Sequence, residues 1–213
     1  MTKQFIQPDW FWHLLGIDKP KENALVKINN MEFKIQNSIP RFLQKNSKTQ
    51  QQTSDTFGFK WEKRDTFEGN VNEQLGVWLK EKYGEIDKDF LTKFDKKPYI
   101  LDAGCGAGVS GMSYFKNILD KVNYLGVDIS SAVDVAALRF FEKNINSSFM
   151  QCDLARLPFE ENIFDIIFSE GVLHHTDNTF NALELLCKYL KINGKIYFYV
   201  YKKKAPLREF SDD

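Results

Sequence analysis

The stretch that decides the fold is Leu101-Asp102-Ala103-Gly104-Cys105-Gly106-Ala107-Gly108, at positions 101–108 of a 213-residue chain. It joins a short apolar segment at Tyr99–Ala103 to a predicted helix at Val109–Leu119. Glycine at every second position lets the backbone approach a ligand closely, and the free N–H groups at the start of a helix suit an anionic group. The stretch therefore predicts a ligand-binding turn between a strand and a helix.

Strand and helix patterns alternate beyond this turn. Strands are expected at Asn123–Val127, Ser148–Cys152, Phe164–Ser169 and Lys195–Tyr201, and helices at Ser131–Lys143 and Asp177–Leu190. Such alternation indicates βαβ units, and so an α/β fold with a doubly wound, mostly parallel sheet covered on both faces. Ligands bind at the carboxyl ends of the strands in sheets of this kind.

The first 56 residues have a different texture, rich in Lys, Asn and Gln. Alternating apolar residues at Ala24–Ile28 and Met31–Ile35 flank Asn29-Asn30, which is typical of a hairpin turn. The segment Gln44–Thr56 nearly lacks apolar residues and predicts a linker. We expect residues 1–56 to form a small β-containing appendage with a polar linker, ahead of a main domain at residues 57–213 whose core is residues 98–203.

The main domain begins with dense aromatic residues at Phe57, Phe59, Trp61 and Phe67. A helical pattern follows at residues 71–83 and continues after Gly84 toward Phe94. Aromatic clusters are more often packed than ligand-bound, so this segment is interpreted as a packing arm against the sheet.

Composition excludes several classes of protein. With 29 Lys and Arg against 29 Asp and Glu, the formal net charge is zero and no strong attraction to nucleic acid is expected. The basic run Lys202–Lys204 is interpreted as solvated. Three scattered cysteines with no CxxC pair predict neither a disulfide framework nor a metal site. The apolar run Trp10–Ile17 is too short for a membrane span, and we expect a cytoplasmic protein.

Acidic residues follow the first three predicted strands. Asp102 lies at the glycine turn itself, where it would repel a pyrophosphate and attract an ammonium group. Asp128 ends the second strand at a spacing suited to ribose hydroxyls, and Asp153 follows the third, where it can accept from an adenine amino group. Gly106–Gly111 also satisfies GxGxxG, so an NAD(P)-dependent oxidoreductase is an alternative that Asp102 disfavours. An adenosyl ligand with an ammonium, a carboxylate and no phosphate fits all three acids.

Four segments resemble, in the correct order, the motifs of class I S-adenosylmethionine-dependent methyltransferases. They are LDAGCGAG at 101–108, YLGVDIS at 124–130, QCDLARLPFEENIFDIIFSEGVLHHT at 151–176 and NGKIYFYVY at 193–201. The nearest likeness is to the small-molecule branch that contains the ubiquinone and menaquinone C-methyltransferases. The resemblance implies a Rossmann-like fold with the parallel order 3-2-1-4-5 and S-adenosyl-L-methionine as cofactor.

The resemblance also implies roles for individual residues. Asp102 and the backbone of the glycine turn would hold the methionine part of the cofactor, Asp128 its ribose, and Asp153 with Leu154 its adenine edge. Glu170 would lie under the methionine end and face the substrate. The implied cofactor-binding set is Asp102, Gly104, Cys105, Gly106, Gly108, Asp128, Ile129, Asp153, Leu154 and Glu170.

The acceptor is less clearly marked. His174 and His175 follow the end of the fourth strand, and either can take a proton from an acceptor hydroxyl near neutral pH. His174 and Glu170 are the candidate catalytic residues. The sequence Ser169–Val172 differs from the Asn/Asp-Pro-Pro-aromatic motif of related nitrogen methyltransferases, which favours a small molecule with an oxygen or carbon nucleophile. A non-catalytic or truncated cofactor-binding or interaction module is the alternative.

The strand at Lys195–Tyr201 is apolar or aromatic on both faces, as suits a strand inside a sheet. Family members add a helix and two further strands there, whereas only 12 residues follow Tyr201 in this sequence. We therefore expect a fold truncated after its fifth strand, or an edge covered by a second copy, another partner or the N-terminal appendage.

Overall fold

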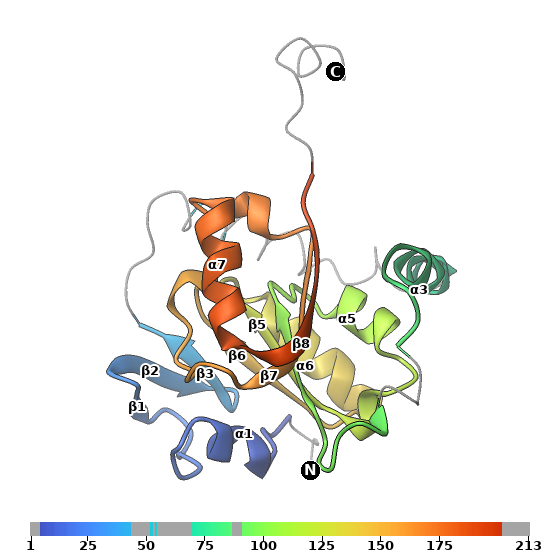
Figure 1. The fold of residues 1–213 in the computed structure, drawn as a ribbon. Coiled ribbons are helices and arrows are strands. Elements are labelled where there is room, and N and C mark those ends of the chain that lie inside the picture. Colours follow the sequence, from blue (N-terminus) through green and yellow to red (C-terminus); the bar gives the residue numbers. More distant parts are fainter. Residues whose placement is uncertain (1–4, 44–51, 53, 55–69, 87–90, 202–213) are drawn as a thin grey trace.

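The computed structural model describes residues 5–43, 52, 54, 70–86 and 91–201 (Figure 1). Its helices are α1 (Asp9–Leu14), α3 (Asn70–Tyr83), α5 (Val109–Tyr114), α6 (Ala132–Glu142) and α7 (Thr179–Tyr189). Its strands are β1 (Leu25–Ile28), β2 (Met31–Gln36), β3 (Ile39–Phe42), β4 (Tyr99–Ala103), β5 (Asn123–Asp128), β6 (Ser147–Gln151), β7 (Phe164–Glu170) and β8 (Leu190–Tyr199). Short 3-10 helices lie at Leu119–Lys121, Leu154–Arg156 and Leu173–His175. The aromatic cluster at Phe57–Phe67, the basic run at Lys202–Lys204 and most of the predicted linker lie outside the described residues.

The strands form one sheet in the order β1-β2-β3-β6-β5-β4-β7-β8. The five strands from β4 to β8 pair in parallel, with β4 between β5 and β7, so the expected order of these five strands is confirmed. Leu101 of β4 is level with Leu125 of β5 and with Ile167 of β7, which brings the carboxyl ends of these strands to one edge of the sheet. The mostly parallel α/β fold is therefore confirmed.

Helices cover both faces of this sheet (Figure 1). Neighbouring residues of a strand point to opposite faces, so Leu101 packs into the core that contains Phe11 of α1 and Leu186 of α7. Ile100 packs into the second core, with Phe140 of α6 and with side chains of α3 and α5. The central strands are buried on both faces, which explains their nearly continuous apolar sequences.

The helix expected at Val109–Leu119 is shorter in the structure, because α5 ends at Tyr114. Phe115 N donates to Gly111 O at 3.0 Å, and Ile118 N then donates to Phe115 O at 2.9 Å in a tighter turn. Phe115, Ile118 and Leu119 have helical spacing and are all buried, so a turn and a 3-10 helix bring to the core the side chains that a longer helix was expected to supply.

The predicted N-terminal hairpin is present and is continuous with the main sheet. Asn29 and Asn30 have positive φ angles of 44° and 64° between β1 and β2, which the short polar side chain of asparagine tolerates. β3 then pairs with β6 in parallel at Arg41 and Gln151. The Arg41 guanidinium donates to Gln151 Oε1 at 2.8 Å and to Asp134 Oδ1 at 2.7 Å, which fixes the hairpin to the edge of the main domain.

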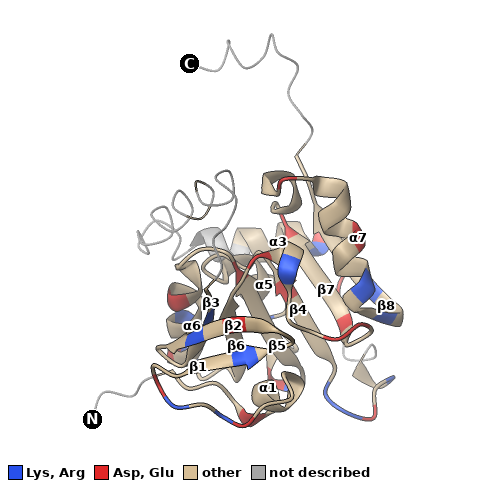
Figure 2. Cartoon of the chain, turned by 90° about the vertical axis from the view of Figure 1, so that its left-hand side faces the viewer, with Lys and Arg blue, Asp and Glu red and all other residues tan. Residues whose placement is uncertain are grey.

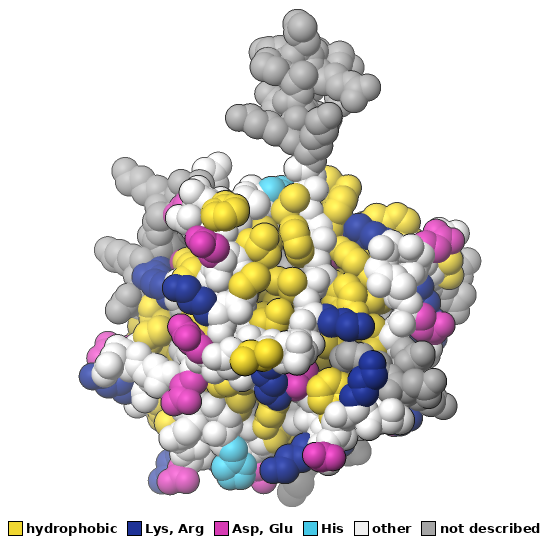
Figure 3. Space-filling model, in the orientation of Figure 1, with side chains coloured by type: hydrophobic (Ala, Val, Ile, Leu, Met, Phe, Trp, Pro, Cys, Tyr) yellow, Lys and Arg dark blue, Asp and Glu magenta, His cyan; other side chains and the backbone are white. Residues whose placement is uncertain are grey.

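The opposite edge of the sheet is β8. Strands β1 to β3 lie beyond β6, so residues 5–43, the described part of the N-terminal segment apart from residues 52 and 54, do not pair with β8, contrary to one of the alternatives from the sequence. β8 begins earlier than expected, at Leu190, and leaves Ile192 and Phe198 exposed at 87% and 39%. Figure 3 shows hydrophobic side chains gathered across this side of the molecule. Coverage of this edge by another chain stays a prediction.

Candidate functional site

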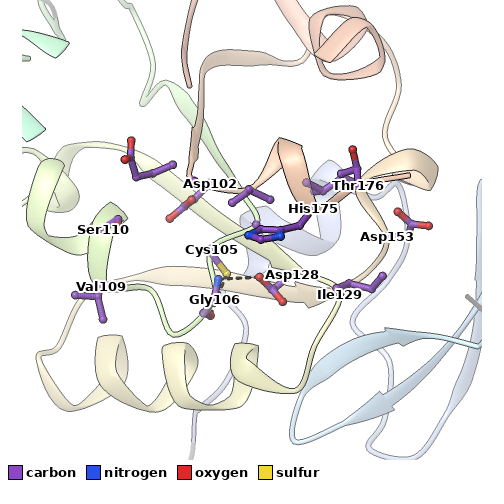
Figure 4. Close-up of a pocket in the computed structure, with 15 residues that line it drawn as sticks. Asp102, Cys105, Gly106, Val109, Ser110, Asp128, Ile129, Asp153, His175 and Thr176 are labelled. Atoms are coloured by element: carbon purple, nitrogen blue, oxygen red, sulfur yellow. Dashed lines mark hydrogen bonds between the residues drawn. The ribbon is translucent and has the colours of Figure 1, made fainter. Parts of the chain in front are cut away.

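A cleft with a cavity volume of about 130 Å³, partly open to solvent, lies at the carboxyl ends of the central parallel strands. Its walls combine the glycine turn after β4 with the ends of β5, β6 and β7 (Figure 4). The lining residues are Asp102, Gly104, Cys105, Gly106, Val109, Ser110, Asp128, Ile129, Asp153, Leu154, Glu170, Gly171, Val172, His175 and Thr176.

The glycine turn is held against the neighbouring strand. The N–H groups of Gly104 and Cys105 both donate to Val127 O, at 2.8 and 3.0 Å. Gly104 has φ +82°, and a Cβ atom built on it would lie 2.3 Å from Val172 Cγ1. No other residue fits this conformation and this space, so the glycine at position 104 is explained by a backbone that lies close to Val172 on the opposite wall of the cleft.

Asp102 is a carboxyl group buried at the base of the cleft, with 2% of its surface exposed. Burial raises its pKa to about 7, although a hydrogen bond from the Tyr124 hydroxyl favours the ionised form. The nearby carboxylates of Asp128 and Glu170 raise this pKa further. A cation beside Asp102 would restore its ionised form, so the group is suited to a positively charged ligand.

Asp128, at the end of β5, accepts three hydrogen bonds from neighbouring backbone and side-chain groups. Its Oδ2 accepts from Gly106 N at 2.9 Å, and its Oδ1 accepts from the backbone and hydroxyl of Ser130 at 2.8 and 2.6 Å. Burial raises its pKa, while these hydrogen bonds lower it. The carboxylate is thereby fixed in orientation at the cleft, and Oδ2 keeps a lone pair for a hydroxyl donor.

Asp153 and Glu170 complete the acidic lining. Asp153 caps a 3-10 helix by accepting from Ala155 N at 2.9 Å, and it contacts Arg156 at 3.3 Å. Glu170, the last residue of β7, pairs with Lys82 at 2.9 Å and accepts from the Tyr83 hydroxyl. Helix α3 therefore reaches the cleft through its last turn.

Of the two adjacent histidines, His175 lines the cleft and His174 does not. In the view of Figure 4 the His175 ring lies between Asp102 and Asp153. The ring of His174 packs instead against Tyr201 at 4.7 Å, and both its nitrogens are buried without a hydrogen-bond partner among the described residues. Burial lowers the pKa of His174, with His175 adding to the effect.

The structure thus brings together nine of the ten predicted cofactor-binding residues; the exception, Gly108, caps α5 with φ 75° beside the cleft. The cleft is also lined by His175, the other histidine considered as a proton acceptor, and by loop neighbours that were not predicted from the sequence: Val109, Ser110, Gly171, Val172 and Thr176. The sequence feature that could have predicted these additional residues is their position next to the glycine turn or to the end of β7.

Within the described ranges, no group of three His, Cys, Asp or Glu side chains is placed to hold a metal ion. The same ranges contain no helix with the length and apolar character needed to cross a membrane.

Comparison with known families identifies residues 101–198 as matching a family described as "Methyltransferase domain". Phosphoethanolamine N-methyltransferase 1 of Arabidopsis thaliana is 30% identical over 133 residues, which are 60% of this chain and 27% of that protein. A probable tRNA methyltransferase 9B of Mus musculus is 31% identical over 122 residues, 54% of this chain and 25% of that protein. The chain therefore spans about a quarter of the length of these relatives.

Among solved structures, similarity extends to a phosphoethanolamine N-methyltransferase 2 from Haemonchus contortus, in complex with phosphomonomethylethanolamine and S-adenosylhomocysteine. The TM-score is 0.56, with 19% identity over 81% of this chain and 41% of that chain. This likeness concerns the fold. A nearer relationship to the ubiquinone and menaquinone C-methyltransferases stays a prediction.

Proposed function

We propose that this chain is a class I S-adenosylmethionine-dependent methyltransferase that transfers a methyl group to a small-molecule acceptor; the match of residues 101–198 to the family described as "Methyltransferase domain" supports this. One observation carries the proposal. A single cleft joins the glycine turn to Asp102, Asp128 and Asp153, the acids that follow three neighbouring parallel strands.

The residues present fit this cofactor. Asp102 is buried with a pKa near neutrality and lacks a paired cation among the described residues, so it suits the methionine ammonium group. Gly104 has no side chain and packs closely against Val172, so the backbone of the turn lines the cleft. Asp128 would accept from the ribose hydroxyls, and Asp153 with Ile129 and Leu154 would surround the adenine.

When bound, the cofactor supplies a methyl group already activated by a positively charged sulfur. The chain then contributes chiefly position and exclusion of water. Glu170 lies on the cleft wall at the end of β7 and would face the acceptor. His175 has the cleft position that the sequence analysis assigned to His174, so the proton-accepting role is tested on both: we expect His175→Ala to lower the rate more than His174→Ala.

The acceptor favoured by the sequence is an oxygen or carbon nucleophile. A nitrogen acceptor is the second candidate, because relatives include proteins named as phosphoethanolamine N-methyltransferases. Figure 2 shows Lys and Arg interspersed with Asp and Glu over the ribbon, which supports a small acceptor over a polyanion. Other relatives are named as probable tRNA methyltransferases, so the experiment must also test RNA as the acceptor.

The experiment is a calorimetric titration with S-adenosylhomocysteine and NAD in parallel, followed by incubation of the protein with methyl-labelled S-adenosylmethionine and a cell extract. We expect S-adenosylhomocysteine to bind, NAD not to bind, and label to appear in the low-molecular-weight fraction. Binding of NAD alone would favour the oxidoreductase alternative. Cofactor binding without any labelled product would favour the non-catalytic module, and label only in RNA would overturn the small-molecule acceptor.

A further inference from the structure

Beside the cleft, the ammonium group of Lys82 is enclosed by aromatic rings and a carboxylate. Its Nζ lies 3.2 Å from the centre of the Tyr199 ring and 4.1 Å from that of Trp78, above the ring faces. A third ring, that of Tyr83, is 5.0 Å away. Glu170 Oε1 lies 2.9 Å from the same nitrogen. We call Trp78, Tyr83, Tyr199 and Glu170 the ammonium cage.

The cage is assembled from two parts of the fold that are distant in sequence. Trp78 and Tyr83 come from the second half of α3, whereas Glu170 and Tyr199 end the neighbouring strands β7 and β8. The rings of Trp78 and Tyr199 are nearly perpendicular, with an interplanar angle of 86°, so they form two walls of a corner. The Tyr83 hydroxyl donates to the second oxygen of Glu170, which fixes the carboxylate at the base of that corner.

This arrangement has the chemistry of a site for an alkylammonium group. Aromatic ring faces attract cations, and several ring faces around one cation are the common means of recognising methylated ammonium groups. The Glu170 side chain is only 10% exposed, and its carboxylate presents an opposite charge to a cation in the cage. A neutral or anionic group in the same place would leave that carboxylate without a cationic partner.

Two features connect the cage with the cleft. Glu170 belongs to both, since it lines the cleft and also pairs with the Lys82 ammonium. Lys82 enters from α3 on a flexible four-carbon stem and keeps 20% of its side chain exposed, while Trp78 is 43% exposed. Lys82 can therefore leave the cage by side-chain rotation without any change in the backbone.

We propose that the ammonium cage is a subsite for a positively charged alkylammonium group of the methyl acceptor, and that the Lys82 ammonium is an internal ligand displaced when the acceptor binds. The subsite rests on the proposed function, since it identifies a substrate class for the same cleft. A cation held there is compatible with methyl transfer to another atom of the same molecule, or to its own nitrogen once that nitrogen has given a proton to water; in both cases S-adenosylhomocysteine is the leaving group.

The test removes the internal ligand. In Lys82→Ala the cage is vacant, so tetramethylammonium, followed by saturation-transfer NMR and calorimetry, should bind at least about tenfold more tightly than to the wild type. The matched control is Lys80→Ala, which removes a lysine of the same helix that pairs with Glu85 at 2.7 Å outside the cage. This control should behave like the wild type. Adding Tyr199→Leu to Lys82→Ala should abolish the gain.

The rival explanation is that Lys82 only fastens α3 to the sheet. In that case Lys82→Ala would lower the unfolding temperature and bind tetramethylammonium no better than the wild type, a result that overturns the proposal. Lys82→Ser provides the same vacancy if the alanine variant does not fold. Each protein is also titrated with S-adenosylhomocysteine. If Lys82→Ala binds S-adenosylhomocysteine but not tetramethylammonium, the subsite alone is refuted. If the wild type does not bind S-adenosylhomocysteine, the proposed function is refuted.

Discussion

Replacing Asp102 by asparagine is the most informative single change in the cleft. It removes the buried charge, so it shows both how much that charge destabilises the fold and how much it contributes to ligand binding. The amide has nearly the shape of the carboxyl group and stays uncharged at every pH. In the wild type, burial raises the pKa of Asp102 from 3.8 to about 7. The folded-state pKa is above the unfolded one, so this contribution to stability is present at low pH and is lost as the pH rises through about 7.

The size of the effect follows from that interval. Each pH unit between the two pKa values is worth about 1.4 kcal/mol, so full ionisation costs the folded wild type on the order of 4 kcal/mol. Asp102→Asn does not bear this cost. The free energy of unfolding of the variant minus that of the wild type should therefore increase by about 2 to 3 kcal/mol from about pH 5 to about pH 8. Urea denaturation at both pH values measures it.

The same variant should bind S-adenosylhomocysteine at least about tenfold more weakly, because the amide no longer attracts the ammonium group. Asp165→Asn is the matched control, since Asp165 is also buried yet already pairs with Lys191 at 2.9 Å, away from the cleft. We expect that control to lose stability and keep its affinity. A stability difference between Asp102→Asn and wild type that stays constant or shrinks with rising pH would refute the reasoning.

Three further changes test the cleft and its support. Asp128→Ala should weaken S-adenosylhomocysteine binding by about 1.5 to 3 kcal/mol, measured by calorimetry, because it removes a charged acceptor; unchanged affinity would contradict the ribose assignment. Gly104→Ala should destabilise the fold by about 1 to 2 kcal/mol because of its φ of +82° alone, and a clash with Val172 should add to this loss. Adding Val172→Ala should relieve the clash and leave the backbone strain, so the double variant should recover part of the lost stability in urea denaturation. If it recovers none, the contact with Val172 is unimportant. Arg41→Ala breaks the ion pair with Asp134 and should lower the free energy of unfolding by about 1 kcal/mol, again read from urea denaturation; a neutral result would mean that backbone pairing alone holds the hairpin.

The sequence by itself determined the elements whose signals are local. Glycine spacing, the apolar period of each segment and the acids after the strands are read within about ten residues, so the strand at Tyr99–Ala103 and the helix at Ala132–Glu142 were predicted to within about one residue. The acids of the cleft were also predictable, because parallel strands bring their carboxyl ends to one edge. Asp102, Asp128 and Asp153 accordingly line one cleft.

The tertiary structure alone decided the features that depend on contacts between distant segments. The pairing of β3 with β6 involves one aligned pair, Arg41 and Gln151, and no local sequence pattern predicts that these two residues pair. The choice of His175 over His174 for the cleft depends on the rotation of a 3-10 turn, where adjacent residues point in different directions. The ammonium cage joins a helix near residue 80 to strand ends near residues 170 and 199, and only the packed chain brings a helix face and two strand ends around one cation.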